Sequence, residues 1–558
     1  MLLRPTILSG VPRTEIPVKS ESSALRDFTV DGRVWLLSGV ALIIGIGAAL
    51  LAVLLLRLIA LSTNLFYYQR FSWAPVPASG SSLGYWMVLI PVIGGLLVGL
   101  MARFGSDKIR GHGIPEAIEA ILLNRARVDP KIAILKPISA AIAIGSGGPF
   151  GAEGPIIMTG GAFGSLIAQW IHLTDAERTT LLVAGAAAGM SATFATPVAA
   201  LLLAVELLLF ELRPRSLVPV AIASVTAAIL RGYLLGPGPL FPMPGIGNVG
   251  RISFAIGSLL LGAVVGLIAA GLSRMMYAFE DLFERLPIHW MWWPALGGVG
   301  VGIGGLFFPR GLGVGYNNIA ELLQGNAPVA LILGIVIAKS LMWAFSLGSG
   351  TSGGVLAPLL MIGGAVGGLA GHLGKGPAEV QAFWALIGMG AMLAGSLGVP
   401  LTAILFSLEV THCLPALVPL TLGCITSYLV TALLMPRSIL TEKLSRRGYH
   451  LTREYGVDPL EIVIVRDLMS RISQPRSSVE KAALPHLFIY EDSTCRSAAE
   501  MMATEGIDTL PVVDRTTELI NGTITLQDLL KGRNKAVVRE SERLRLVSHS
   551  KNTRSKFT

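Results

Sequence analysis

Two stretches of the chain carry the same pattern of glycine, proline and lysine. Residues 136–164 read KPISAAIAIGSGGPFGAEGPIIMTGGAFG, and residues 339–367 read KSLMWAFSLGSGTSGGVLAPLLMIGGAVG. The two align without a gap at a lysine, GSG, a glycine, a proline, a methionine and GGA, with an offset of 203 residues. The same offset relates Glu206 to Glu409 further along the chain. Matches that keep their order over this distance indicate an internal duplication rather than chance similarity between glycine-rich segments.

The duplication continues upstream and lies in apolar sequence. GHGIPEAIEAI, from Gly111, resembles GVGYNNIAELL, from Gly313, at an offset of 202. Only 14% of the residues are charged and 52% are hydrophobic, whereas soluble domains carry about 25% charged residues. Several apolar runs are long enough to cross about 30 Å of hydrocarbon, and others are short and interrupted by glycine or proline. We therefore predict an all-α polytopic membrane protein with two halves, at about 31–236 and 250–440, in either an inverted or a parallel arrangement.

Three segments share one design, in which a glycine-rich turn enters an apolar helix through a proline. Proline is favoured in the first helical turn, and glycine permits close approach of the backbone. The first N–H groups of a helix lack partners within the helix and carry the positive end of its dipole. Converging starts of this kind would hold an anion without lysine or arginine, and therefore weakly enough to release it. The segments are Gly111-His112-Gly113-Ile114-Pro115, Gly151-Ala152-Glu153-Gly154-Pro155 and Gly354-Val355-Leu356-Ala357-Pro358.

Glu153 is the residue that most strongly indicates function. An acidic side chain costs about 2.5–3.5 kcal/mol at the centre of a membrane, and such residues are usually functional. At the start of a helix, the carboxylate can occupy the position of a permeating anion and leave on protonation. We therefore predict that Glu153 is both gate and proton acceptor, with helix capping at a membrane surface as the alternative. Glu206 and Glu409 are expected to be structural, paired with basic residues or with backbone.

These segments resemble the CLC family of chloride channels and chloride/proton exchangers, over about residues 30–445. GHGIPEA is similar to the family's GSGIPE, GAEGP to GREGP, and GGVLAP to GGIFAP. The resemblance implies an inverted-repeat fold with broken, re-entrant helices, and a homodimer with one pore in each subunit. It also implies that Glu153 is the external gating glutamate, that chloride is the bound ion, and that the backbone amides at 151–154 and 355–356 line its path.

Four positions depart from the family pattern. His112 stands at the central serine, where its neutral imidazole can donate one N–H to an anion and would make the site sensitive to acid; in the alternative it packs while main-chain amides bind the ion. Ala152 replaces an arginine beside the gate. Leu207 replaces the inner glutamate of exchangers, and Leu440, in ILTEKL, replaces an inner tyrosine. Because leucine neither carries a proton nor donates a hydrogen bond, a channel and a loosely coupled exchanger both fit.

Other functions fit the sequence less well. Pro155 keeps the chloride-type GEGP pattern as GAEGP, which disfavours a fluoride exchanger. A duplicated secondary transporter for another anion, such as a carboxylate, would need charged substrate partners in both halves. A nucleotide-sensing membrane protein with a vestigial pore would bind nucleotide without moving anions. The sequence contains no CxxC pair, no His/Cys/Asp cluster with metal-ligand spacing and no nucleophile–base pair, so we expect neither a metal site nor an enzyme.

Much of the formal net charge of +9 comes from lysine and arginine beside the apolar runs. The basic clusters at 103–131 and 437–447 are typical of cytoplasmic loops. Both termini are therefore predicted on the cytoplasmic side of a cell (inner) membrane, with the lipid bilayer and not nucleic acid as the partner. Residues 1–30 are expected to form a cytoplasmic segment and 31–444 the membrane domain, while the basic tail at 535–558 has a composition typical of disorder.

Residues 445–534 have ordinary polarity and are predicted to form a small α/β cytoplasmic domain. Residues 497–505 are helix-periodic, and LPVVD and NGTIT have the character of strands joined by a polar turn. The segment resembles one CBS motif, in which Thr525 and Asp528 of GTITLQD would contact the ribose of an adenine nucleotide. Because a nucleotide cleft needs two motifs, the partner would be a second subunit or a degenerate repeat at 462–490. The alternative is a dimerising or stabilising module without a ligand.

Overall fold

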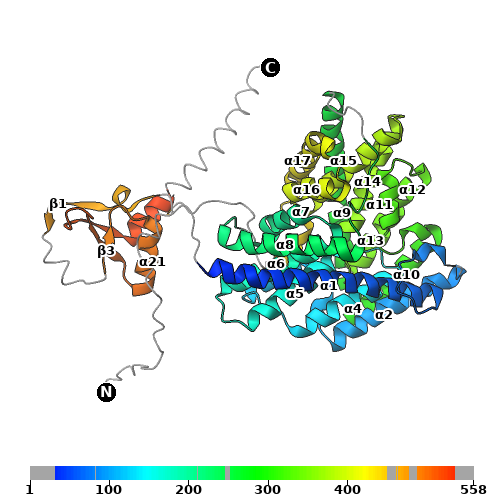
Figure 1. Cartoon of the computed structure of the whole chain (residues 1–558), viewed down its shortest axis with the longest axis horizontal. Helices are drawn as coiled ribbons and strands as arrows, with labels where there is room; N and C mark the ends of the chain where they lie inside the picture. Colours follow the sequence, from blue (N-terminus) through cyan, green and yellow to red (C-terminus); the bar gives the residue numbers. More distant parts are fainter. Residues whose placement is uncertain are drawn as a thin grey trace. The chain divides into compact units, whose positions relative to one another are not determined.

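The described residues form two compact units (Figure 1). The larger lies within Val30–Arg453, and the smaller lies C-terminal to it. The computed structural model describes residues 32–81, 83–209, 211–245, 252–448, 460, 463–476 and 487–534. The expected N-terminal segment at 1–30 and the basic tail at 535–558 lie outside the described residues.

The helices of the larger unit fall into two series, one for each half predicted from the sequence. In the first series, α7 continues into a π-helical turn, η5 (Ala204–Leu209). In the second, the π-helical turn η8 (Ile335–Lys339) joins α12 to α13. The first series is α1 (Arg33–Tyr68), α2 (Leu89–Phe104), α3 (Ile114–Leu123), α4 (Pro130–Gly145), α5 (Glu153–Gln169), α6 (Asp175–Phe194), α7 (Pro197–Leu203) and α8 (Pro214–Leu235). The second is α9 (Ile252–Glu284), α10 (Trp293–Phe307), α11 (Tyr316–Leu323), α12 (Val329–Gly334), α13 (Ser340–Gly348), α14 (Leu356–Leu373), α15 (Ala378–Leu397), α16 (Pro400–Thr411) and α17 (Leu417–Leu434), followed by α18 (Ile439–Arg446).

The two series match at the offset of the duplication, and the repeat is inverted. Helices α6 and α15 are separated by 203 residues at both ends, as are the first residues of α5 and α14. Gly95 of α2 packs against the backbone of Pro294 in α10. Reciprocally, Gly298 of α10 packs against the backbone of Pro91 in α2. Equivalent helices can exchange such contacts only when they run in opposite directions, and glycine lets them approach closely.

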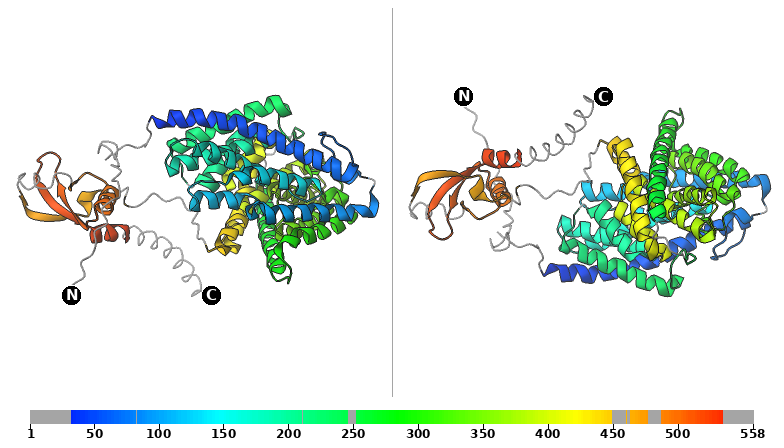
Figure 2. Two further views of the ribbon diagram at one scale, coloured as in Figure 1. Left: turned by 90° about the horizontal axis from the view of Figure 1, so that it is seen from below. Right: turned by 90° about the horizontal axis from the view of Figure 1, so that it is seen from above.

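Eight helical segments in the described part of the chain are long and apolar enough to cross a membrane. Within the 18-residue apolar stretches of α14 and α15, 78% and 83% is buried inside the protein. These two helices therefore lie at the centre of the unit. Helices α1 and α8 pack along each other, as do their equivalents α9 and α17 (Figure 2). These outer helices expose large apolar side chains, among them Ile43, Ile229, Leu260 and Leu433. A surface of this kind fits contact with lipid.

A pair of matching glutamates ties the two halves together. The Glu206 carboxylate accepts hydrogen bonds from two backbone amides at the start of α16, at 3.1 and 2.8 Å. The Glu409 carboxylate accepts from two amides at the start of α7, at 3.0 and 2.8 Å. Each glutamate therefore caps a helix of the other half and places negative charge at its N-terminus. The structural role expected for both is confirmed, with backbone amides as the partners.

The smaller unit contains a four-stranded sheet in the order β1-β4-β3-β2. Its elements are β1 (Ser470–Arg476), β2 (Ile489–Tyr490), α21 (Cys495–Glu505), β3 (Thr509–Val513), β4 (Ile520–Thr525) and a helix at 526–534. Strand β3 is antiparallel to β4 and parallel to β2. Buried side chains of α21 and of the central strands form one apolar core, so the predicted α/β character is confirmed.

The hypothesis of a degenerate second repeat at 462–490 is wrong. The described residues of that segment supply β1 and β2 to the same sheet, where β1 pairs with β4 and β2 pairs with β3. The physical reason is that the β3–β4 pair has two open edges, which need partners of their own. The described residues of the smaller unit thus form a single motif.

Candidate functional site

The three glycine–proline segments, far apart in the sequence, meet in the interior of the larger unit. Gly151 and Gly354 exchange backbone hydrogen bonds, with N···O distances of 3.1 and 2.9 Å. Gly111 N donates to Thr351 O at 3.2 Å, and Gly353 N donates to Gly111 O at 3.4 Å. Every residue of the three segments is buried. The starts of α3, α5 and α14 therefore surround one buried region.

This convergence requires glycine where the backbones cross. A Cβ atom on Gly154 would overlap the carbonyl oxygen of His112. A Cβ atom on Gly113, whose φ is +90°, would lie 2.6 Å from the carbonyl oxygen of Gly154. Since no side chain fits at either position, glycine allows the start of α3 to touch the first turn of α5.

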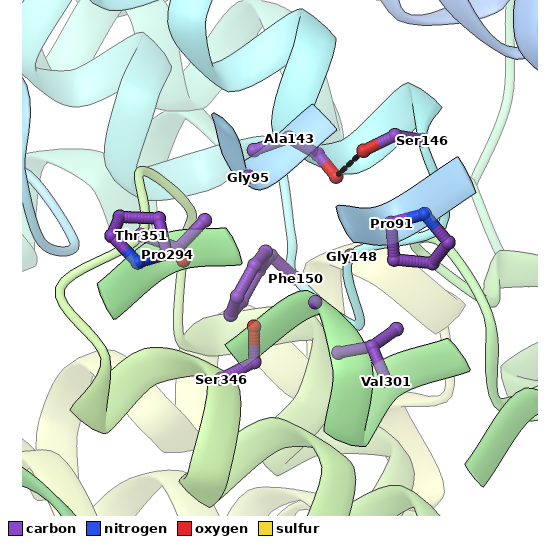
Figure 3. A pocket seen from close by; sticks show the side chains of 11 residues that line it. Pro91, Gly95, Ala143, Ser146, Gly148, Phe150, Pro294, Val301, Ser346 and Thr351 are labelled. Atoms are coloured by element: carbon purple, nitrogen blue, oxygen red, sulfur yellow. Dashed lines mark hydrogen bonds between the residues drawn. The ribbon is translucent and has the colours of Figure 1, made fainter. Parts of the chain in front are cut away.

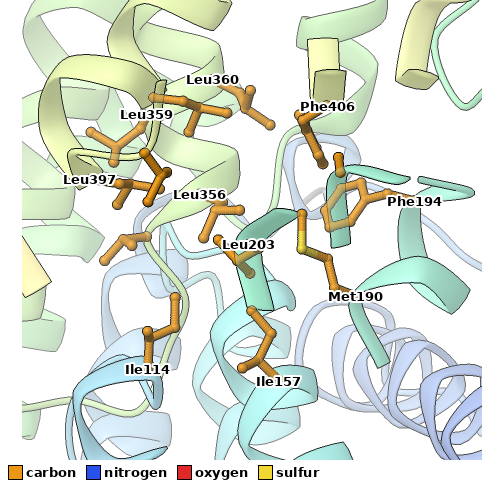
Figure 4. Close-up of a cluster of buried hydrophobic side chains, with 14 of the residues drawn as sticks. Ile114, Ile157, Met190, Phe194, Leu203, Leu356, Leu359, Leu360, Leu397 and Phe406 are labelled. Carbon is orange, nitrogen blue, oxygen red and sulfur yellow. The ribbon is translucent and has the colours of Figure 1, made fainter. Parts of the chain in front are cut away.

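The side chains around the helix starts are mainly apolar. Figure 4 shows Ile114, Ile157, Leu203 and Leu356, from α3, α5, α7 and α14, in one buried cluster. Such side chains offer nothing to an anion. The polar groups of this region are therefore the backbone amides and a few embedded side chains, of which Glu153 is one.

Glu153, the first residue of α5, is fully buried in this region. Its Oε1 atom accepts a hydrogen bond from the Tyr316 hydroxyl at 3.1 Å. Its Oε2 atom lies against Gly151 and Gly354, and a Cβ atom on Gly354 would be 3.0 Å from it. Among the described residues, Oε2 has no side-chain hydrogen-bond partner. The carboxylate thus occupies the point where helix starts from the two halves meet.

Tyr316 is a site residue that sequence reasoning missed. It begins α11, the equivalent of α3, directly after Gly315, whose φ is +82°. A fourth helix start therefore joins the site. The similarity of GHGIPEAIEAI to GVGYNNIAELL contained the signal, since it aligns Tyr316 with Ile114. No rule of local sequence, however, connects Tyr316 with a glutamate 163 positions away.

Two buried lysines, equivalent in the two halves, hold the loops that lead into α3 and α11. The Lys136 ammonium group donates to two carbonyl oxygens of the loop before α3, both at 2.8 Å. The Lys339 ammonium group donates to two carbonyl oxygens of the loop before α11, at 2.8 and 2.7 Å. In the sequence these lysines only mark the duplication; in the structure they shape both loops and add buried positive charge beside the helix starts.

His112 is only 2% exposed, and its Nδ1 atom has no hydrogen-bond partner in the described part of the chain. One residue later, Gly113 N donates to the Glu116 carboxylate at 2.9 Å. The same carboxylate accepts from Lys443 Nζ, of α18, at 2.7 Å. Buried polar atoms without partners are rare and call for an explanation. Among the described residues, His112 Nδ1 therefore stands without a partner beside this ion pair.

The other three positions that depart from the family pattern are all fully buried. Ala152 directly precedes Glu153, Leu207 lies in η5, and Leu440 lies in the first turn of α18. All three belong to the apolar core. Apolar side chains therefore fill the places where the resemblance leads one to expect an arginine, a glutamate and a tyrosine.

Two of the cavities in the described part of the chain lie among these helices. The smaller is lined by uncharged residues of α2, α4, α10 and neighbouring segments, including Phe150 and Thr351 (Figure 3). Because it has no titratable lining residue, it offers little chemistry. The second, of about 310 Å³, has a charged lining that includes Asp107, Lys108, Arg110, Glu116, Glu119, Arg127, Asp129 and Arg447. Met158 of α5 also lines it, so this charged cavity borders both α3 and α5.

In the smaller unit, Thr525 and Asp528 contact each other. The Asp528 carboxylate accepts hydrogen bonds from Thr525 N at 3.1 Å and from Thr525 Oγ1 at 2.7 Å. Asp528 N donates in return to Thr525 Oγ1 at 3.2 Å. This reciprocal pattern is a capping box at the start of the helix at 526–534. Helix capping accounts for both residues, and their contact with a nucleotide stays a prediction.

The chain matches two known protein families and resembles several known transport proteins. The family model for the voltage gated chloride channel matches residues 93–432, and that for the CBS domain matches residues 465–535. A putative chloride channel protein, ClcB-like, from Ralstonia nicotianae is 31% identical over 64% of this chain and 84% of its own length. The H(+)/Cl(-) exchange transporter ClcA of Citrobacter koseri is 30% identical over 64% of this chain and 80% of its own length.

Among solved structures, a slow cyanobacterial Cl−/H+ antiporter aligns with a TM-score of 0.65. The alignment covers 75% of this chain and 99% of that one, at 23% sequence identity. It shows a shared fold, which agrees with the inverted pairs of helices described above. The family match spans more than half of the chain and includes all the helix starts of the candidate site. The chain therefore belongs to the voltage gated chloride channel (CLC) family and carries a C-terminal CBS domain.

Proposed function

We propose that this protein moves chloride and similar small anions across the membrane, along a path lined by the starts of α3, α5, α11 and α14 and gated by Glu153. The observation that carries the proposal is the position of the Glu153 carboxylate. It is a fully buried carboxyl group, seated where the starts of α5 and α14 pair through Gly151 and Gly354. An anion at this point would contact the same backbone groups at the helix starts, which together form a cradle for it.

Helix starts are suited to binding an anion briefly. Each offers unpaired amides and a dipole worth about 0.3–2 kcal/mol, so several must act together. Because no full charge needs to touch the ion, it can also leave. The ionised side chain of Glu153 competes with the anion for the cradle. Protonation removes this competition, and transport should therefore depend on pH.

Two forms of transport fit the site. The apolar Leu207 and Leu440 favour channel-like conductance, because neither can serve as an inner proton carrier or hydroxyl donor. Retention of Glu153 favours loosely coupled chloride/proton exchange, in which water carries protons to the carboxylate from the inner side. The names of the two relatives, a putative chloride channel and an H(+)/Cl(-) exchange transporter, divide in the same way.

His112 is proposed to take part in anion coordination through its unpartnered ring nitrogen. A neutral imidazole donates one N–H, which replaces the hydroxyl that the family's serine would supply. Glu116, whose carboxylate accepts from the next residue's amide, Gly113 N, and its ion-pair partner Lys443 would tune this contact.

We further propose a homodimer in a cell (inner) membrane, with one pore in each subunit and both termini cytoplasmic. The basic clusters at 103–131 and 437–447 support this orientation. We assign residues 31–444 to the membrane domain and 445–534 to the CBS-like domain. Since the described residues form one CBS motif, an adenine nucleotide would bind between the motifs of two subunits.

Flux from liposomes tests the proposal. Purified protein should dissipate a chloride gradient, and Glu153→Gln, which resembles the protonated glutamate, should flatten the pH dependence. Glu321→Gln is the matched control, because Glu321 pairs with Arg310 on the surface at 2.9 Å; its pH curve should equal that of the wild type. A folded wild-type protein without halide flux would contradict anion transport. Identical curves for the wild type and Glu153→Gln would remove Glu153 as the gate.

The reversal potential under opposed chloride and proton gradients separates the two forms of transport. If conductance is passive, the reversal potential should follow the chloride gradient alone. If transport is by exchange, the reversal potential should also shift with the proton gradient. Sustained uphill movement of protons, driven by chloride, would exclude a simple channel.

A further inference from the structure

We propose that the Tyr316 hydroxyl is a latch that holds the ionised Glu153 carboxylate in its seat and thereby sets how readily the gate opens. The inference rests on the proposed function of Glu153 and deepens it. Tyr316 is a positioning residue in this scheme, since it acts through the carboxylate.

The contact joins the two halves of the protein at the gate itself. The hydroxyl donates to Oε1 at 3.1 Å, and Glu153 is fully buried. A hydrogen bond to an ionised group is stronger than one between neutral groups, and a surrounding of low dielectric constant strengthens it further. The bond therefore favours the seated, ionised carboxylate over the neutral one.

Aromatic neighbours hold the Tyr316 ring. Phe194 meets it edge-on at a centroid distance of 6.3 Å, and Phe241 meets it at 5.9 Å. Phe194 is in turn packed edge-on against Phe406 at 5.1 Å. All three phenylalanines are buried. Because rotation of the tyrosine would sacrifice these contacts, its hydroxyl stays directed at Glu153.

The backbone before α11 is fixed as well. Gly315 adopts a φ of +82°, and Gly313 N donates to Gly147 O at 3.0 Å. The carbonyl of Gly313 accepts from the buried Lys339 ammonium group at 2.7 Å. The hydroxyl is therefore in place before the carboxylate returns to its seat, so that little further ordering is needed when the gate closes.

Packing alone does not explain the hydroxyl. The cage of phenylalanines would accommodate a phenylalanine ring equally well, and the equivalent position in α3 is Ile114, which has no donor. Among the described residues, the hydrogen-bond partner of the Tyr316 hydroxyl is Glu153. The hydroxyl thus has a partner whose charge changes with gating and no evident structural task.

Tyr316→Phe tests the latch, since it keeps the ring and removes only the donor. Without the hydrogen bond, the carboxylate is protonated more easily, so the midpoint of the flux–pH curve should move up by about one pH unit. At a pH above the wild-type midpoint, flux should rise by up to about tenfold. Tyr428→Phe, on the exposed face of α17, is the matched control and should leave the curve unchanged.

A double-mutant cycle separates the latch from a general loosening of the protein. In the Glu153→Gln background there is no carboxylate to hold, so adding Tyr316→Phe should change neither flux nor its pH dependence. An unchanged curve for Tyr316→Phe alone, or the same shift in both backgrounds, would overturn the latch while leaving the proposed function intact. A wild-type protein without halide flux would overturn the proposed function, and the latch with it.

Discussion

The starts of α3 and α11 share one backbone design but carry different chemistry. Each follows a glycine of positive φ, +90° in the first half and +82° in the second, and each is preceded by a loop that a buried lysine holds. The side chains differ at four positions in and beside the candidate site. First-half His112, Ile114, Glu116 and Glu153 correspond to second-half Val314, Tyr316, Asn318 and Leu356.

This difference separates scaffold from mechanism. The features that both halves keep, namely the lysines, the capping glutamates and the glycines at crossings, build the cradle of helix starts. The features that occur in one half only, a carboxylate from the first and a hydroxyl from the second, form the proposed gate. Duplication thus supplies a symmetric frame, and divergence supplies groups that can act on one another across it.

The largest effect is expected where the shared frame is tightest. Gly154→Ala would place a methyl group into the carbonyl oxygen of His112 and near Gly354. Overpacking usually costs about 1–3 kcal/mol, and here backbone must move, so we expect a clearly lower Tm and loss of halide flux. Gly271→Ala in α9 is the control, because an added Cβ there meets nothing within 4 Å. Normal stability and flux for Gly154→Ala would show that the crossing is not a tight one.

Next in size is the loss of a loop-holding lysine. Lys136→Met and Lys339→Met each leave two buried or partly buried carbonyl oxygens without their donor, at a cost of about 1–3 kcal/mol. If the lysines serve the frame, the two variants should lower the Tm by similar amounts in thermal unfolding of the purified protein. A strong effect from only one of them would mean that the halves do not share this part of the scaffold.

A smaller and again symmetric effect is expected from the capping glutamates. Glu206→Gln and Glu409→Gln remove the charge at the start of α16 and α7, which should cost about 1 kcal/mol in each case. Chemical unfolding of the two single variants measures this cost. Unequal losses, or a gain in stability, would argue against reciprocal capping.

The smallest effect is expected at a position that differs between the halves. His112→Ser should change halide preference or acid sensitivity by a few-fold, because it replaces an unpartnered imidazole nitrogen with a hydroxyl. The control is Val314→Ser at the equivalent place in the second half. Halide-specific efflux at several pH values provides the measurement. If both variants behave like the wild type, His112 serves packing.

Much of the fold and part of the candidate site could be predicted because their signals are local. Proline and glycine mark where the broken helices begin, and an acidic residue within GAEGP stands out against apolar surroundings. The role of Glu206 and Glu409 was anticipated, although not that each would cap the opposite half. The error at 462–490 has the same origin, because two short strands have too little pattern to show which sheet they join.

The sequence by itself determined the duplication, the membrane class and the family, and it singled out Glu153 as the proposed gate, since each depends on residue type and spacing. The residue pattern alone left the direction of the repeat open; the family resemblance implied an inverted repeat, and the structure confirms it. Only the tertiary structure decided that a fourth helix start reaches the site and that Tyr316 contacts Glu153. These are contacts between segments more than a hundred residues apart. Their geometry depends on how whole helices pack, and packing of that kind leaves no trace in local sequence.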